Sequence, residues 1–194
     1  MPRNEYLRQE LLTLAAEDLR VAEELAADGS LYDGYHPRME AIHRRNAARL
    51  REIIAEKGWP GASLVGEDGA EAAWLIVQHA IGEPDLLRSC LPSLWDAASR
   101  GEATSWQAAM LEDRIRMFEG RPQRFGTQLE PDEEGWLRPY RTEDPDGVDE
   151  RRRAVGLEPL AERLARAGQQ PLPPDRAQFE REYQNWLRRV GWRR

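Results

Sequence analysis

The run AEAAWLIVQHAI, residues 70–81, decides the fold, because it is apolar almost throughout and ends on Gln78-His79. A helix that is apolar on every side is buried in the middle of a protein. We therefore predict a central helix here, with further helices stacked around it. The two polar side chains near its end require partners, because a buried polar group without a hydrogen bond costs about 1 to 3 kcal/mol.

Two amphipathic helices are predicted before this run. Apolar residues recur at three- and four-residue spacing from Glu5 to Ala27, which indicates one apolar helical stripe. The second helix is expected from about Pro37 to Lys57, because proline suits the first turn of a helix. Residues 62–69 contain glycine and are expected to form a loop. The predicted stripe of the first helix consists of Leu7, Leu11, Leu14, Ala15, Leu19, Ala22, Leu25 and Ala26.

The sequence after the central run predicts more helices and one hairpin. Residues 121–140 combine prolines and glycines with β-favouring Phe125, Trp136 and Tyr140 around an acidic turn, a pattern typical of a β-hairpin. Helical spacing covers residues 84–99, 104–119, 148–155, 159–167 and 175–190. The predicted fold is therefore mainly α, an antiparallel helical stack of about six to eight helices with one small β-hairpin near residues 121–140.

The length of 194 residues fits a single domain. We expect this helical domain to span residues 1–168, followed at residues 169–194 by a proline-rich linker and a C-terminal amphipathic helix. Tyr183, Trp186 and Leu187 lie along one side of that helix. It is expected to pack on the domain or on a partner, including a second copy of the chain.

Charge and hydropathy exclude several classes of protein. The net charge of −7 argues against a general affinity for nucleic acid. No apolar run reaches the roughly 18 to 20 residues that span a membrane, and the first residues lack the apolar core of a secretory signal, so a cytoplasmic protein is expected. The single cysteine, Cys90, cannot form an internal disulfide and is expected to be buried.

The polar pair Gln78-His79 is the first candidate site. Histidine can act as an acid, a base or a metal ligand near neutral pH, whereas the alternative is a core histidine bonded to a neighbouring carbonyl group. Asp113 and Arg114 flank the apolar side of the helix at 104–119. The carboxylate can orient a histidine and the guanidinium can bind an anionic group, and a solvated ion-pair face explains the same two residues.

The run PQRFGTQ, residues 122–128, is a second candidate, because Gln123 and Gln128 surround a glycine that lets the backbone approach a ligand closely. Arg152 can reach inward from the helix at 148–155, or it can serve in surface ion pairs. The chain contains no phosphate-loop, dinucleotide-binding, zinc-protease or serine-hydrolase motif.

A third candidate is a metal site. His36, Glu40 and His43 lie at offsets of four and seven, so one side of a helix can present them to an ion. Pro37 places His36 at or before the helix start, which leaves the direction of that ring open. We predict no cofactor, and we retain His43 and His79 as the ligands of a metal-dependent alternative.

Several separated motifs occur in one order: GWP at 58–60, AWLIVQHA at 73–80, DRI at 113–115, PQRFGTQ at 122–128 and VDERR at 148–152. In this order they resemble a bacterial family known only as a domain of unknown function, the one numbered 6624, over roughly residues 43–160. The resemblance implies no activity, and Phe125 stands where the family usually has tyrosine. The family pattern includes Gln78, His79, Asp113, Arg114, Gln123, Gly126, Gln128, Asp149 and Arg152.

Three functions are consistent with these residues. The first is an enzyme acting on a small anionic substrate, in which His79 is the general acid or base, Asp113 orients it, and Gln78, Arg114, Gln123, Gln128 and Arg152 bind the substrate. The second is a non-catalytic ligand- or protein-binding module whose polar cluster is a buried structural network. The third is a metal-dependent hydrolase that uses His43 and His79.

Overall fold

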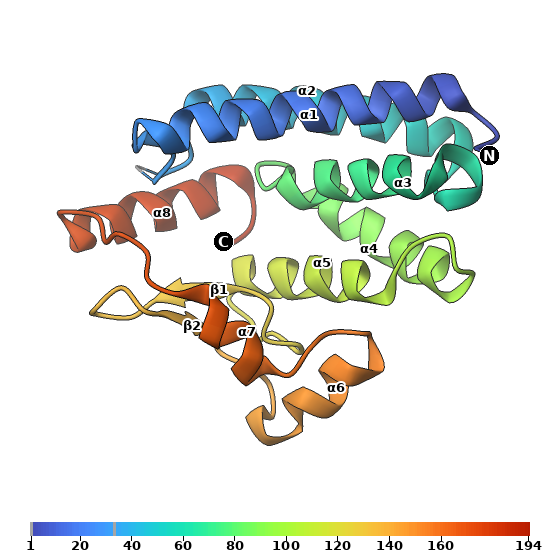
Figure 1. The fold of residues 1–194 in the computed structure, drawn as a ribbon. Coiled ribbons are helices and arrows are strands. Elements are labelled where there is room, and N and C mark those ends of the chain that lie inside the picture. The colour runs from blue at the N-terminus through green and yellow to red at the C-terminus, as the bar shows by residue number, and fades with distance from the viewer. Residues whose placement is uncertain (1, 33) are drawn as a thin grey trace. The chain divides into compact units, whose positions relative to one another are not determined.

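Figure 1 shows the computed structural model of the chain, which describes residues 2–32 and 34–194. Within these residues it contains eight α-helices, two short 3-10 helices and one two-stranded antiparallel sheet. The mainly α fold with a small hairpin is thereby confirmed. The chain divides into two compact units, Met1–Thr104 and Ser105–Arg194. The expected division at residue 168 stays a prediction.

The first unit consists of α1 (Glu5–Ala27), α2 (Pro37–Lys57), α3 (Ala62–His79) and α4 (Pro84–Ser99), with the 3-10 turn η1 (Ser30–Tyr32) after α1. Helix α3 is the central element, because it packs against α1, α2 and α4. Figure 1 shows α1 and α2 side by side above it. The apolar run therefore occupies the position that its composition predicts.

The buried side of α1 differs from the predicted stripe. Leu19 is 47% exposed, and the stripe runs through Asp18 and Val21 instead. The spacing of a helix allows both paths, and the apolar residues alone favour the one through Leu19. A charged residue therefore lies on the buried side of α1.

The loop predicted at residues 62–69 is wrong, because α3 already begins at Ala62. Gly66 interrupts this helix with φ of +77° and ψ of 166°, a conformation that is essentially restricted to glycine. Asn4 donates its backbone N–H to the carbonyl oxygen of Leu64 at 2.9 Å, which holds the first turn of α3 against the start of α1.

The second unit begins with α5 (Ser105–Phe118). The two strands, β1 (Leu129–Pro131) and β2 (Leu137–Pro139), form the hairpin, with Glu130 opposite Arg138. They are short, because residues 121–128 before them form a separate loop along α5. Next come η2 (Pro145–Gly147), α6 (Val148–Ala154), α7 (Leu160–Ala167) and α8 (Arg176–Val190).

The C-terminal segment packs on α5 through aromatic rings. The Phe118 ring lies 5.7 Å from that of Trp186 and 5.0 Å from that of Trp192, between centroids. Arg193 donates to the carbonyl oxygens of Phe118 and Met117 at 2.9 and 3.2 Å, so it caps the end of α5. None of the described helices is both long and apolar enough to cross a membrane.

Candidate metal centre

One carboxylate and two imidazoles meet in the first unit. Asp18 comes from α1, His43 from α2 and His79 from the last position of α3. Asp18 Oδ1 lies 3.3 Å from His43 Nε2, and Asp18 Oδ2 lies 2.9 Å from His79 Nδ1. One ligand atom from each residue lies within 4.8 Å of the other two. The three side chains therefore form one hydrogen-bonded cluster, with Asp18 between the two rings.

The helices position these side chains through their buried sides. Asp18 lies on the buried stripe of α1, and His43 lies on the buried side of α2. One turn after His43, Asn46 donates from Nδ2 to the carbonyl oxygen of Leu14 at 3.2 Å and ties α2 to α1. His79 is the end of α3, because the next residue leaves the helical conformation. Three different helices thus fix the cluster.

Asp18 is the most buried side chain of the cluster, and His79 is the most exposed. Asp18 is 1% exposed, whereas the side chain of His79 is 28% exposed. Burial alone would raise the pKa of Asp18, but the hydrogen bonds from His43 and His79 outweigh it and hold that pKa below its ordinary value. The carboxylate therefore stays ionised at neutral pH and offers a negative charge to a cation.

Tyr35 makes the next contact outward. Its hydroxyl oxygen lies 2.8 Å from His43 Nδ1, and the two rings stack with their centroids 5.6 Å apart and 26° between planes. Burial raises the pKa of the Tyr35 hydroxyl, so this group stays protonated. The two rings also line a small pocket of about 10 Å³, room for about one water molecule. Its other lining residues are Glu40, Arg44, Ala80, Gly82 and Glu83.

The donor set fits a first-row transition metal. Two imidazole nitrogens and one carboxylate oxygen are ligands of Zn²⁺ and Fe²⁺ sites, and three protein ligands leave coordination positions open. Two ligand atoms that sit about 2 Å from one tetrahedral ion are about 3.4 Å apart. The 3.3 Å between Asp18 Oδ1 and His43 Nε2 matches this spacing, whereas the 2.9 Å to His79 Nδ1 is shorter and is measured from the other oxygen, Asp18 Oδ2.

The predicted helical trio contributes only one of its members to this cluster. His36 caps its own helix, because its Nδ1 accepts from the backbone N–H of Arg38 at 3.2 Å. Glu40 forms an ion pair with Arg44 at 2.8 Å. Of the three, only His43 faces Asp18, a residue outside the predicted site. The structure thus brings His43 and His79 together through a residue on a third helix.

The other predicted site residues lie in both units. Gln78 is buried on α3 beside His79, whereas Arg114 lies on α5 of the second unit. Burial lowers the pKa of Arg114 to about 10. The predicted substrate-binding roles of both residues stay predictions.

Asp113 receives hydrogen bonds from the loop that follows α5. Its carboxylate oxygens accept from the backbone N–H groups of Arg124 at 2.7 Å, Phe125 at 3.1 and 3.2 Å, and Thr127 at 3.0 Å, and from the Thr127 hydroxyl at 3.0 Å. Burial raises the pKa of Asp113, although these hydrogen bonds oppose the shift. The carboxylate bonded to His79 is that of Asp18, and the role of Asp113 in orienting a histidine stays a prediction.

The two glutamines stabilise the same loop. Gln123 donates from Nε2 to the carbonyl oxygens of Gln128 at 3.0 Å and Tyr140 at 2.7 Å, and its Oε1 accepts from the backbone N–H of Gln128 at 2.9 Å. Gln128 donates from Nε2 to the Thr127 hydroxyl at 3.0 Å. Gln123 therefore binds the loop to the residue that follows β2, and Gln128 makes a contact within the loop.

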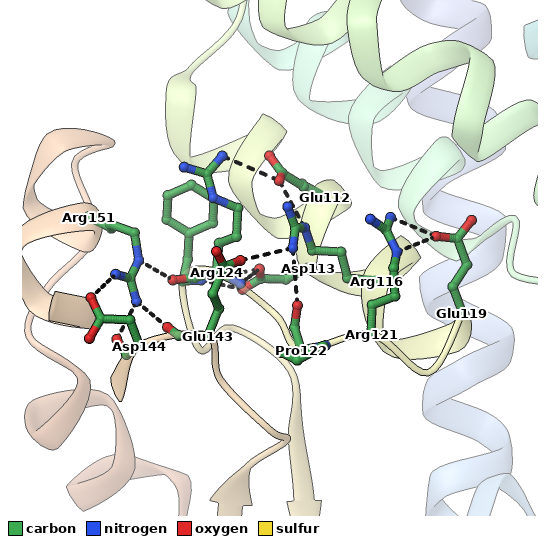
Figure 2. A network of polar contacts seen from close by, with 11 residues as sticks. Glu112, Asp113, Arg116, Glu119, Arg121, Pro122, Arg124, Glu143, Asp144 and Arg151 are labelled. Carbon is green, nitrogen blue, oxygen red and sulfur yellow. Dashed lines mark hydrogen bonds and ion pairs between the residues drawn. The ribbon is translucent and has the colours of Figure 1, made fainter. Parts of the chain in front are cut away.

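Two arginines of α6 bind the loop from the other side. Arg152 is 2% exposed and donates to the carbonyl oxygens of Phe125 and Glu158, both at 2.6 Å. Figure 2 shows Arg151, which donates to the carbonyl oxygens of Arg124, Glu143 and Asp144 at 2.8, 2.5 and 2.7 Å. These hydrogen bonds of Arg151 and Arg152 therefore all lead to backbone carbonyl oxygens of the chain.

Residues 5–168 match the model of a family of unknown function (DUF6624). No curated protein and no solved structure matches the chain.

Proposed function

The chain belongs to this family of unknown function, and we propose that it is a metal-dependent hydrolase whose ion is held by Asp18, His43 and His79. The observation that carries the proposal is the convergence of one carboxylate and two imidazoles, from three helices, within 4.8 Å. A metal ion with three protein ligands can bind a water molecule and lower its pKa toward neutrality. Such a water molecule can act as the nucleophile of a hydrolysis reaction, and no other cofactor is needed.

Burial and charge support this assignment. A carboxylate that is 1% exposed is costly unless it is paired, and here its two neighbours are imidazoles rather than permanent cations. A divalent ion would compensate the charge of Asp18 and accept lone pairs from His43 Nε2 and His79 Nδ1. The exposure of His79 leaves a side on which water and substrate can reach the ion.

A second candidate function rests on the 2.9 Å contact between Asp18 and His79. If Asp18 Oδ2 accepts from Nδ1–H, then Nε2 of a neutral His79 carries no proton and can act as a general base. His43 would then complete the hydrogen bonding of Asp18, and no ion would be needed. This candidate retains the predicted acid–base role of His79, with Asp18 as the orienting carboxylate.

Metal binding by the purified chain of residues 1–194 tests the proposal. We expect one Zn²⁺ or Co²⁺ per chain by elemental analysis and titration, and a loss of at least about 100-fold in affinity for His43→Ala and for His79→Ala. The matched control is His36→Asn, because asparagine also caps helices and position 36 lies outside the cluster. Its affinity is expected to equal that of the wild type.

The two candidates differ in what contradicts them. A folded wild-type protein that binds neither ion, or variants that bind as tightly as the wild type, would rule out the metal centre. The acid–base candidate then predicts that chelators leave turnover of model esters and phosphoesters unchanged, while His79→Ala abolishes it. Turnover that chelators abolish and Zn²⁺ restores supports the hydrolase.

A further inference from the structure

His43 has a partner at each ring nitrogen. Nε2 lies 3.3 Å from Asp18 Oδ1, and Nδ1 lies 2.8 Å from the Tyr35 hydroxyl. A neutral imidazole carries a single N–H, so one nitrogen donates and the other accepts. Because an ionised carboxylate can only accept, Nε2 carries the proton in the ion-free protein. Nδ1 then accepts from the Tyr35 hydroxyl.

An ion at the centre requires the opposite arrangement. Nε2 must give its lone pair to the metal, so the proton moves to Nδ1, which becomes a donor. A hydroxyl group can accept as well as donate, and its hydrogen rotates without any movement of the oxygen. A carbonyl oxygen at this place would suit only the ion-bound ring, and a backbone N–H would suit only the ion-free ring.

We propose that Tyr35 is a positioning residue that lets His43 bind and release the metal ion by exchanging its two tautomers. The inference rests on the proposed function. The stacking of the two rings holds the hydroxyl beside Nδ1 in this structure, and rotation of the hydroxyl hydrogen lets the same contact serve the ion-bound ring. Release of the ion therefore leaves no unpaired group at Nδ1, and the site is suited to reversible binding of a transition-metal ion.

Tyr35→Phe tests the role of the hydroxyl, because it retains the ring and its stacking. We expect the affinity for Zn²⁺ to fall about 10- to 100-fold, the usual effect of removing an outer partner of a ligating histidine. The matched control is Tyr6→Phe, the same change at a residue that is 84% exposed, and it is expected to bind with wild-type affinity. Circular dichroism of both variants checks the fold.

Nitrogen NMR of the wild-type protein gives a readout that needs no variant. In the ion-free protein the signals of His43 are expected to show a protonated Nε2 and an unprotonated Nδ1, and excess Zn²⁺ is expected to reverse them. A ring that carries its proton on Nδ1 in both states, or a Tyr35→Phe protein that binds Zn²⁺ as tightly as the wild type, overturns this inference alone. A ring that keeps its proton on Nε2 with Zn²⁺ present overturns His43 as a ligand and thus the proposed function. A wild-type protein that binds no ion overturns the proposed function as well.

Discussion

The pKa values of two buried aspartates in this chain are shifted in opposite directions. Asp18 faces two imidazoles, and their hydrogen bonds hold its pKa below the ordinary value in spite of burial. Asp113 faces backbone N–H groups and one hydroxyl, and burial raises its pKa. Asp18 is thus bonded to side chains that can exchange protons and bind metal ions, whereas the partners of Asp113 are mainly backbone N–H groups.

Replacement of Asp113 by asparagine is expected to destabilise the second unit. The amide NH2 group would replace one of the two acceptor oxygens, so it would face either the N–H groups of Arg124 and Phe125 or those of Phe125 and Thr127. Leaving such buried donors unpaired costs about 2 to 4 kcal/mol. Urea denaturation measures the loss, and the exposed Asp146→Asn is a control that is expected to leave stability nearly unchanged. Equal stability of the two variants would contradict the described role.

Asp18 predicts a dependence of stability on pH. A carboxylate whose folded pKa lies below its unfolded value stabilises the folded state above the unfolded pKa, about 3.9. This stabilisation is lost as the pH falls through the folded pKa. The difference in free energy of unfolding between the wild type and Asp18→Asn is therefore expected to shrink as the pH falls below about 4. Denaturation at several pH values measures it, and a constant difference would contradict the prediction.

The sequence predicts His79 but not Asp18, for a physical reason. His79 ends an apolar run, and that context alone requires a partner. Asp18 stands between Glu17 and Leu19 in a helix with many acidic residues, where a carboxylate usually faces solvent. Its burial depends on which residues of α1 form the buried stripe and on its contacts with His43 and His79, which lie on other helices. The residues next to Asp18 in the sequence reveal neither of these.

At the level of elements, α3 shows how tertiary contacts override local preference. Gly66 and Gly69 lower the helical propensity of residues 62–69, which favours a loop. In the structure the N-terminus of α1 holds this segment as a helical turn, through the Asn4–Leu64 hydrogen bond and the ion pair of Arg8 with Asp68. The hairpin was located correctly, but its strands are short because the loop at 121–128 is bound to Asp113.

Gly66→Ala is expected to destabilise the protein by about 1 to 3 kcal/mol, because an alanine at φ of +77° and ψ of 166° is strained. The added Cβ would also come within 3.1 Å of Asp68 Oδ1. Thermal and urea denaturation measure the effect. The exposed neighbouring change Glu67→Ala serves as the control, and a Gly66→Ala protein as stable as this control would show that the kink in α3 is not required.

For the whole molecule, the predicted residues separate into two groups with different partners. His43 and His79 lie in the first unit and share Asp18. Asp113, Gln123, Gln128 and Arg152 lie in the second unit, where their described hydrogen bonds join the loop at 121–128 to α5, the hairpin and α6. The sequence could identify both groups as polar positions with special requirements. It could not assign partners, because these come from helices and loops that are distant in the chain.

This separation predicts where a bound ion stabilises the molecule. The three proposed ligands join α1, α2 and α3, so an ion binds only when these helices are folded together. At a free Zn²⁺ concentration of about 100 times the Kd, mass action adds about 2.7 kcal/mol to the folded state. Amide hydrogen exchange in α1, α2 and α3 is therefore expected to slow by up to about 100-fold for amides that exchange through opening of the site. The control is His79→Ala under the same conditions, in which no slowing is expected. Unchanged exchange in the three helices of the wild type, or equal slowing in the variant, would contradict an ion bound at this centre.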